Sequence, residues 1–537
     1  MTKKTLIRGG RIIDGTGTPA FAGDLLVADG LIAAMGSAGS FDGVDAENIS
    51  AQNAFVVPGF IDVHSHADNA PMVEPTDVSK VLQGVTTEVV GNCGFTLART
   101  TDEFLEDMEG LLGRIFPQLD LTWSDFAGLH AQLDMLGYVT NHATLVGHNT
   151  VRVSAMGMSA EPADASQMRL MVDQVKAAAA QGVVGLSSGL IYPPGQFAPQ
   201  SELVELVQAL PDHLPYVTHM RGEGTMLLRS LDEAIAIGRD AGRPVHISHL
   251  KAAGRQAWGS IARALDLIDA ANSDGMRVSH DIYPYTASST MLTATLPPWF
   301  QEGGNGGVLR RLSDRRALDR ARSELAMDTD TWENHVYGCG WDRIVIASTR
   351  SHAFEGSSLQ AISDDLGLDP FDALTHVLRA EELEASMIMH SMHEDDVIAA
   401  LKHPGTMIGS DGLPPGRGGK PHPRMWGTFP RVLDRYVAKL GILTLEEAIR
   451  RMTSLPAQTF ALRDRGVIRE TAVADLVLIE TDGVADRATF DDPCSPPRGV
   501  RTVVLGGETV VSDGSFTSVR AGRRIQAGAS TSSAKSG

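Results

Sequence analysis

Residues 57–68 read Val-Pro-Gly-Phe-Ile-Asp-Val-His-Ser-His-Ala-Asp, an apolar run that ends in a His-x-His pair. On a strand, His64 and His66 project from the same face, because successive side chains alternate. Two imidazoles on one face can share a divalent metal ion. A bare His-x-His pair is more often solvated or packed in a core, but the apolar lead here favours a metal site at a strand end.

Short apolar stretches alternate with helical ones through residues 58–463. The stretches 85–91 and 244–248 are typical of buried strands, and 166–181 and 230–241 are typical of helices. This alternation predicts a parallel α/β fold, and about 250 residues suffice for an eight-fold barrel. We therefore expect a distorted (β/α)8 TIM barrel over 58–463, with its site at the carboxyl ends of the strands.

The same region contains more strand candidates than a barrel needs. Residues 343–347 and 386–390 also have the composition of strands. Part of the region must then belong to an insertion. Residues 300–342 are the best candidate for it, since they are charged, rich in glycine and weakly periodic.

The two ends of the chain have the pattern of a small β domain. Residues 1–57 contain short strands and a hairpin on Asp29-Gly30, and residues 464–525 contain strands around a Gly506-Gly507 turn. We expect these ends to pair into one β-sandwich that flanks the barrel. The Ala-, Ser- and Gly-rich residues 526–537 are expected to be a disordered tail.

Composition limits the class of protein. The 537 residues include 43% hydrophobic and 21% charged residues, with 46 Lys plus Arg against 66 Asp plus Glu, a net charge of −20. Such an acidic surface repels nucleic acid and anionic membranes, so neither is an expected partner. Three cysteines, no signal sequence and no long apolar run predict a cytoplasmic enzyme with a small-molecule substrate. The oligomeric state stays open, a homo-oligomer included.

Four further predicted strands end in residues that commonly bind metals. With the His-x-His pair they bring ligand-type side chains to one face of the barrel. These residues are His64, His66, Cys93, His219, His249 and Asp411. A single strand-end cysteine is more often inert packing, but this many strand ends together favour a metal site. Thiolate, imidazole and carboxylate in combination favour zinc.

The sequence resembles the D-aminoacylase (N-acyl-D-amino-acid deacylase) branch of the amidohydrolase superfamily over nearly its whole length. Gly-Asn-Cys-Gly at 91–94 is the discriminating motif, because many relatives bridge two metals with a carboxylated lysine, whereas this branch uses a cysteine. The other matching segments are 64–66, 185–195, 218–223, 246–251, 281–285, 289–292, 409–414 and 422–429.

The resemblance implies a role for each metal-site residue. His219, His249 and Cys93 would hold one tightly bound zinc ion. A second, weaker divalent site would use His64 and His66, with Cys93 bridging and Asp411 nearby. Asp411 would also act as general base and then general acid. This chemistry is reasonable on its own terms, since zinc polarises an amide carbonyl and a carboxylate can move the proton of the attacking water.

The free α-carboxylate of the substrate needs cations, and the resemblance assigns this role to Arg424, assisted by Lys251, Tyr283 and Ser289. A guanidinium suits bidentate recognition of a carboxylate. The segment 414–421 is longer than usual for the family, which makes Arg417 and Lys420 alternative partners. Histidines in loop or helical contexts, such as His335, are expected to be solvated or to cap helices.

The predicted reaction is zinc-dependent hydrolysis of the amide bond of N-acyl-D-amino acids to a carboxylate and a free D-amino acid. Another amidohydrolase, acting on cyclic amides, dipeptides or N-acyl-L-amino acids, is the first alternative, because pocket loops determine the substrate. A non-catalytic barrel scaffold is a remote one, since it would have lost metal ligands and none is missing from the sequence.

Overall fold

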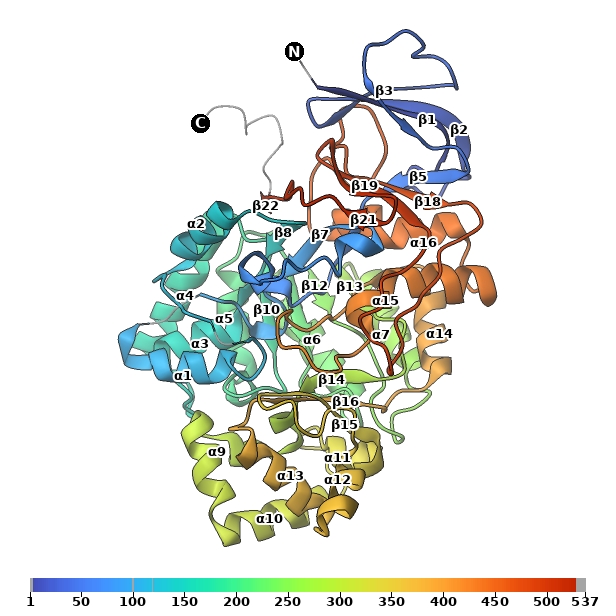
Figure 1. Cartoon of the computed structure of the whole chain (residues 1–537). Coiled ribbons are helices and arrows are strands. Elements are labelled where there is room, and N and C mark those ends of the chain that lie inside the picture. The colour runs from blue at the N-terminus through green and yellow to red at the C-terminus, as the bar shows by residue number, and fades with distance from the viewer. Residues whose placement is uncertain (1–2, 99–100, 118, 528–537) are drawn as a thin grey trace.

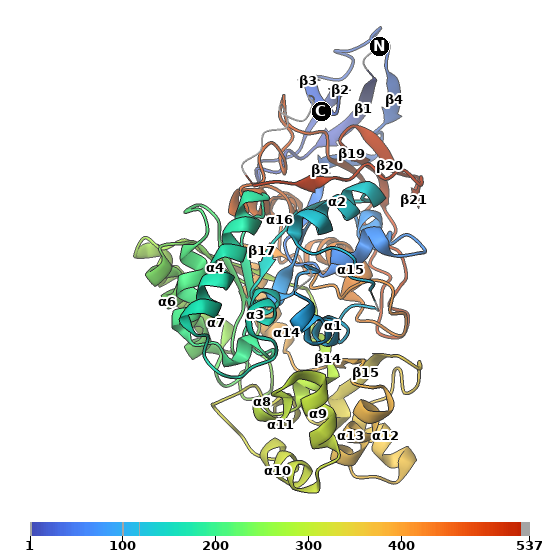
Figure 2. The same ribbon diagram turned by 90° about the vertical axis from the view of Figure 1, so that its left-hand side faces the viewer.

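The computed structural model describes residues 3–98, 101–117 and 119–527, which form three parts stacked in a row (Figure 1). A β domain built from both ends of the chain lies at the top, a barrel in the middle and a lobe at the bottom, and the view turned by 90° shows the same order (Figure 2). Of the expected tail, residues 528–537 lie outside the described residues. Within the described ranges, no helix combines the length and apolar character needed to cross a membrane.

Eight strand positions form the barrel, each parallel to the neighbours it pairs with. They are β6 (Phe60–Asp62), β7 (Val85–Val90), β8 (Asn141–Thr144) continuing as β9 (Val146–Gly147), β10 (Leu186–Gly189), β11 (Tyr216–His219), β12 (Val245–Ile247), β13 (Val278–Ile282) and β17 (Thr406–Ile408). A parallel bridge between Ser65 and Gly412 connects the segments that follow the first and last strands. The predicted TIM-barrel fold is confirmed.

The distortion of the barrel has a clear location. The short strand β22 (Arg524–Ile525) pairs in parallel with β8, whereas β9 pairs with β10. In a regular barrel, β10 would pair along the whole strand formed by β8 and β9. Here β22, from the C-terminal region, pairs with the first half of that strand instead. The wall of the barrel is completed by residues far from it in sequence.

The helices that follow the strands cover the outside of the barrel. Neighbouring helices pack side by side, and Figure 2 shows α4, α6 and α7 on one flank. They are α4 (Ala165–Ala180), α5 (Gln200–Gln208), α6 (Leu227–Ala241), α7 (Ile261–Ser273), α14 (Glu394–Lys402) and α16 (Leu445–Met452). Helix α4 starts with a capping box between Asp164 and Gln167, and α6 ends at Gly242, whose φ of 67° suits glycine. Further helices are α1 (Leu105–Leu112), α2 (Phe126–Leu136), α3 (His148–Met156), α15 (Arg424–Arg431) and α17 (Ser454–Thr459).

The two ends of the chain combine into the expected β domain, a nine-stranded sheet. Its strands are β1 (Lys4–Ile12), β2 (Phe21–Ala28), β3 (Leu31–Gly36), β4 (Glu47–Ser50), β5 (Ala54–Pro58), β18 (Leu476–Glu480), β19 (Val500–Leu505), β20 (Glu508–Ser512) and β21 (Ser515–Phe516). The halves join where β5 runs antiparallel to β18. Both predicted hairpin turns have two residues with positive φ, at Asp29-Gly30 and at Gly506-Gly507. Leu25, Ile32 and Leu476 share one apolar core across the halves.

The lobe accounts for the surplus strand candidates. β14 (Ser288–Met291), β15 (Ile344–Thr349) and β16 (Ala385–Met389) form a separate antiparallel sheet. It is accompanied by α8 (Pro298–Gln301), α9 (Gly304–Leu312), α10 (Arg315–Leu325), α11 (His335–Cys339), α12 (Leu359–Leu366) and α13 (Pro370–Ala380). The lobe leaves the barrel after β13 and returns before β17, so it lies beside the carboxyl ends of the strands and extends on both sides of the predicted insertion 300–342.

Candidate active site

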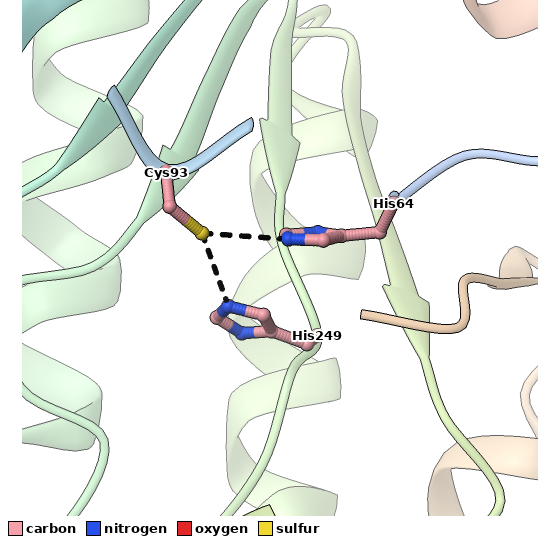
Figure 3. A group of neighbouring side chains, drawn as sticks. All are labelled: His64, Cys93 and His249. Atoms are coloured by element: carbon pink, nitrogen blue, oxygen red, sulfur yellow. Dashed lines mark hydrogen bonds between the residues drawn. The ribbon is translucent and has the colours of Figure 1, made fainter. Parts of the chain in front are cut away.

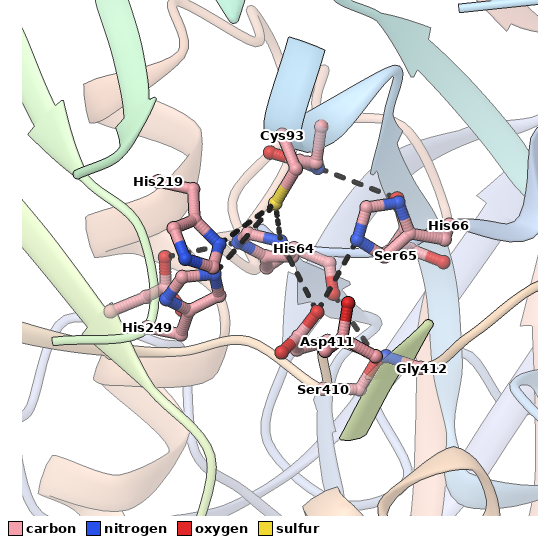
Figure 4. A network of polar contacts seen from close by, with 12 residues as sticks. His64, Ser65, His66, Cys93, His219, His249, Ser410, Asp411 and Gly412 are labelled. Carbon is pink, nitrogen blue, oxygen red and sulfur yellow. Dashed lines mark hydrogen bonds and ion pairs between the residues drawn. The ribbon is translucent and has the colours of Figure 1, made fainter. Parts of the chain in front are cut away.

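The structure brings the six ligand-type side chains together in one buried cluster (Figure 4). His64 and His66 follow β6, and His219 is the last residue of β11. Cys93, His249 and Asp411 lie in the turns that follow β7, β12 and β17. All of them are at most 7% exposed, Asp411 being the most accessible. The strand-end position that the sequence predicted therefore places them at one face of the barrel.

Cys93 lies at the centre of this cluster. Its Sγ is 3.4 Å from Nε2 of His64, 3.7 Å from Nδ1 of His219 and 3.7 Å from Nε2 of His249. Figure 3 shows the rings of His64 and His249 directed at the sulfur from two sides. A thiol surrounded by imidazole nitrogens is a donor set that suits zinc.

Three overlapping groups of side chains have ligand atoms within 4.8 Å of one another. The groups are His64, Cys93 and His249; His64, His66 and Asp411; and His219, Glu223 and His249. Because they overlap, adjacent metal ions would share ligands. The thiol, imidazole and carboxylate donors present fit zinc.

The backbone around the cluster is unusual. Cys93, His249 and Asp411 have φ values of 55°, 37° and 48°, in the left-handed region that residues with a side chain seldom occupy. Such conformations persist where the surrounding structure enforces them, commonly at functional sites. Gly189 contributes to this packing, since a Cβ on it would lie 2.2 Å from the carbonyl oxygen of Cys93.

Burial sets the protonation of these ligands. It lowers the pKa of His66 to about 4, lowers that of His219 well below its usual range and lowers that of His249. The three imidazoles are therefore neutral at pH 7, as metal binding requires. Burial also raises the pKa of the Cys93 thiol well above its ordinary value, so a metal ion would have to displace the thiol proton.

Asp411 is ionised although it is buried. Burial by itself would raise its pKa, but the charge of Arg424 and a hydrogen bond from His66 hold the pKa of Asp411 well below its usual range. Its Oδ2 is 2.8 Å from Nη1 of Arg424, and its Oδ1 is 3.3 Å from Nε2 of His66. The carboxylate is thus available as a proton acceptor at the edge of the metal cluster.

The predicted substrate-binding residues surround the ring of Tyr283. The guanidinium of Arg424 lies 4.7 Å and Nζ of Lys251 lies 5.8 Å from the ring centre. Arg424 also donates to the carbonyl oxygen of Ser289 at 2.9 Å, whereas the Ser289 hydroxyl donates to Met387. The Tyr283 hydroxyl is buried and has no hydrogen-bond partner among the described residues. Two cations and a free phenol thus lie near Asp411.

Of the three candidate cations in and after the longer segment 414–421, Arg424 is the one at this site. Arg417 instead donates to the carbonyl oxygens of Gly113 and Arg114 after α1. The backbone N–H of Lys420 donates to Ala347 in the lobe. The segment thus contacts the turn after α1 and the lobe, whereas Arg424 pairs with Asp411.

The cavity in front of the cluster has walls from both the barrel and the lobe. The barrel contributes His66, Cys93, Phe95, Ile115, Ile191, Tyr192, His219, Glu223, His249, Lys251, Ala253, Asp411 and Leu413, and the lobe contributes Ser288, Ser289, Thr290, His335 and Met389. The lobe therefore covers the open end of the barrel at the metal cluster.

Several residues of the site were missed at the level of sequence. Glu223 lies 3.1 Å from Nδ1 of His249. A carboxylate four residues after a strand-end histidine was a signal from which it could have been found. Asp281 accepts a hydrogen bond from His246 at 2.8 Å and lies 3.7 Å from Nδ1 of His64. His335 was expected to be solvated or capping, but it is buried and lines the cavity. Nothing in its loop sequence indicated this.

His335 leads to a prediction about acid stability. Burial lowers the pKa of His335 from 6.5 to about 4, so the unfolded chain binds a proton that the folded chain does not. This difference in proton binding makes the free energy of unfolding depend on pH. The contribution of His335, up to about 3 kcal/mol, is fully present above pH 6.5 and is lost as the pH falls toward 4. We expect urea unfolding of the metal-free protein to show a shallower loss of stability over this range in His335→Gln. The exposed His213 is the control, and an equal effect of His213→Gln would contradict the prediction.

Comparisons with known proteins identify the family of the chain. Residues 47–296 and 365–511 match the Amidohydrolase family, and the unmatched interval lies in the lobe. The chain is 34% identical to the D-aminoacylase of Alcaligenes xylosoxydans xylosoxydans over 96% of each protein. The crystal structure of N-acyl-D-glutamate deacylase from Bordetella bronchiseptica, with zinc and a phosphonate mimic of the tetrahedral intermediate, superposes with a TM-score of 0.82 at 34% identity, covering 98% of this chain and all of that one. A D-aminoacylase with a binuclear metal centre, described as activated by one metal and attenuated by a second, gives 0.81 at 33% identity over 97% and 99% of the two chains.

Proposed function

Because the chain belongs to the Amidohydrolase family, we propose that it is a zinc-dependent hydrolase that cleaves N-acyl-D-amino acids to a carboxylate and a free D-amino acid. The observation that carries the proposal is the buried thiol of Cys93 among three imidazole nitrogens, with the ionised Asp411 beside them. This donor set suits zinc, and the carboxylate suits proton transfer.

We assign the tightly held ion to His219, His249 and Cys93. A second, weaker ion would use His64 and His66, with Cys93 shared and Asp411 at its edge. Zinc bound here would supply the Lewis acid that polarises the scissile carbonyl and makes water a stronger nucleophile. The overlap of the ligand groups would allow two adjacent ions to share ligands.

Asp411 has the position and charge to move the proton in this reaction. As a carboxylate it accepts a proton from the attacking water, and as a carboxylic acid it then gives the proton to the leaving amine. The ion pair with Arg424 keeps it ionised before the reaction starts. Its 7% exposure is on the side of the cavity, where a substrate would lie.

Arg424, Lys251, Tyr283 and Ser289 are proposed to bind the α-carboxylate of the D-amino acid. Arg424 and Lys251 are paired with Asp411 and Glu223, and a substrate carboxylate would share these cations. The free Tyr283 hydroxyl would donate a further hydrogen bond. A planar guanidinium and a phenol provide directional contacts that orient a carboxylate.

The decisive experiment uses zinc-loaded enzyme and a panel of N-acetyl amino acids offered as separate D and L enantiomers. We expect release of free amine from D substrates and little from L substrates. Release from neither enantiomer contradicts the proposal, and preference for L substrates identifies a different amidohydrolase.

We also infer that the enzyme works in the cytoplasm. The cysteines at 93, 339 and 494 are free thiols. A cysteine ligand such as Cys93 stays available for metal only while it is reduced, and the cytosol maintains thiols in that state.

A further inference from the structure

We propose that Glu223 orients both imidazoles of the tight metal site and that Glu333, from the lobe, fixes Glu223 in place. The inference rests on the proposed zinc enzyme and goes beyond it, because it assigns the lobe a part in metal retention. Both glutamates are positioning residues in this proposal, since neither is needed as a metal ligand.

His219 and His249 present one ring nitrogen to Cys93 and the other to Glu223. For His219, Nδ1 is 3.7 Å from the sulfur and Nε2 is 3.5 Å from Oε2 of Glu223. For His249 the nitrogens are exchanged, with Nε2 at 3.7 Å from the sulfur and Nδ1 at 3.1 Å from Oε1. One carboxylate therefore faces the outer nitrogen of both rings.

The carboxylate acts differently on the two rings. It accepts hydrogen bonds only, so it favours a proton on Nε2 of His219 and leaves Nδ1, which faces Cys93, with a lone pair for a metal. At His249, Nδ1 also lies 2.7 Å from Nζ of Lys251, so Glu223 and Lys251 together hold this ring. Carboxylates that hold metal-binding histidines in this way fix the ring orientation and make the ligand more basic.

Lys251 is the third group at this carboxylate. Its Nζ donates to Oε1 of Glu223, the oxygen that also faces Nδ1 of His249. Oε1 of Glu223 thus faces His249 and Oε2 faces His219.

Glu333 of the lobe binds the backbone at Glu223 and Gly224. Its Oε2 accepts hydrogen bonds from the N–H groups of Glu223, at 2.7 Å, and of Gly224, at 3.1 Å. A Cβ on Gly224 would lie 2.6 Å from Oε1 of Glu333, so the lobe carboxylate packs directly against this turn. The hydroxyl of Thr225 donates to the carbonyl oxygen of Thr329, a second contact between the same segments.

The first test replaces Glu223 by glutamine. A glutamine is neutral and has one acceptor oxygen, so Glu223→Gln can no longer present an acceptor to both rings and loses the charge that pairs with Lys251. We expect zinc affinity, measured by competition with a chromogenic chelator, to fall about 10–100-fold. We also expect an altered absorption spectrum after cobalt substitution, because the thiolate and imidazole geometry around the metal changes.

The matched control is Glu202, another buried carboxylate, which bonds to His148 and Arg152 and is not part of the cavity lining. Glu202→Gln should lower stability without changing zinc affinity or the cobalt spectrum. Equal losses of zinc affinity in Glu202→Gln and Glu223→Gln would reduce the role of Glu223 to folding and overturn the proposal.

The second test compares two substitutions of Glu333. Glu333→Gln keeps an oxygen that can accept both N–H groups and should retain near-normal zinc affinity. Glu333→Ala leaves these donors unpaired, and we expect about tenfold weaker zinc binding. Glu324→Ala, which removes a lobe carboxylate bonded to Trp299 and Arg320, is the control and should bind zinc normally.

The outcomes separate this inference from the proposed function. Wild-type zinc affinity in both Glu223→Gln and Glu333→Ala overturns the positioning role, whatever the activity. If the variants lose zinc affinity as expected but the wild-type protein cleaves no N-acyl-D-amino acid, the positioning role is supported and the proposed reaction is contradicted. If Glu333→Ala does not fold, wild-type affinity in Glu223→Gln alone is sufficient to reject the proposal.

Discussion

Cys93→Ala is expected to lose tightly bound zinc and nearly all hydrolytic activity. The sulfur lies within 3.7 Å of three imidazole nitrogens, so its removal takes away the donor that we propose both metal positions share. Loss of a residue that only supports a ligand costs 10–100-fold in affinity or activity, so loss of the ligand itself should cost more than about 100-fold. The measurements are zinc content after dialysis and kcat/KM for an N-acetyl-D-amino acid.

Cys339→Ala is the matched control, because Cys339 is also a buried thiol, bonded to the carbonyl oxygen of His335. It should keep full zinc content. Undiminished zinc in Cys93→Ala would refute the assignment of Cys93 to the metal centre, and with it the explanation for the Gly-Asn-Cys-Gly motif.

Asp411→Asn should retain the tight zinc but hydrolyse its substrate about 10²–10⁴-fold more slowly, the range for loss of a general acid–base group. His219, His249 and Cys93 are unchanged in this variant, so metal content separates a loss of proton transfer from a loss of metal. The reduction should appear in kcat, because the carboxylate is needed in the chemical step.

Asp486→Asn is a suitable control, since Asp486 forms another Arg–Asp pair, with Arg431 at 3.3 Å, and does not line the cavity. It should leave kcat close to that of the wild type. An Asp411→Asn enzyme that keeps its activity within a few-fold would show that another group moves the proton.

The barrel and the metal cluster were predictable from local sequence, and the reason is geometric. A parallel barrel places the ends of its strands at one face, so ligand-type residues at 93, 219, 249 and 411 had to meet there once the strands were identified. Alternation of side chains then fixed the direction of the His64–His66 pair.

The lobe could not be predicted in the same way. β15 and β16 have the apolar composition of barrel strands, and their antiparallel pairing depends on partners distant in sequence. The role of Glu333 depends on the same docking, because its hydrogen bonds join residues more than 100 positions apart. Contacts of this kind leave no periodic signal in a single sequence.

The pairing of β22 with β8 has a consequence for how the enzyme is made. Until residues 524 and 525 have left the ribosome, the first half of β8 presents an unpaired edge, and the barrel wall stays incomplete. The β domain also depends on late-synthesised residues, since β5 can pair with β18 only after residues 476–480 have been made. The barrel wall is therefore complete only after residues 524 and 525 have been synthesised, and until then its open edge is exposed to association with other chains.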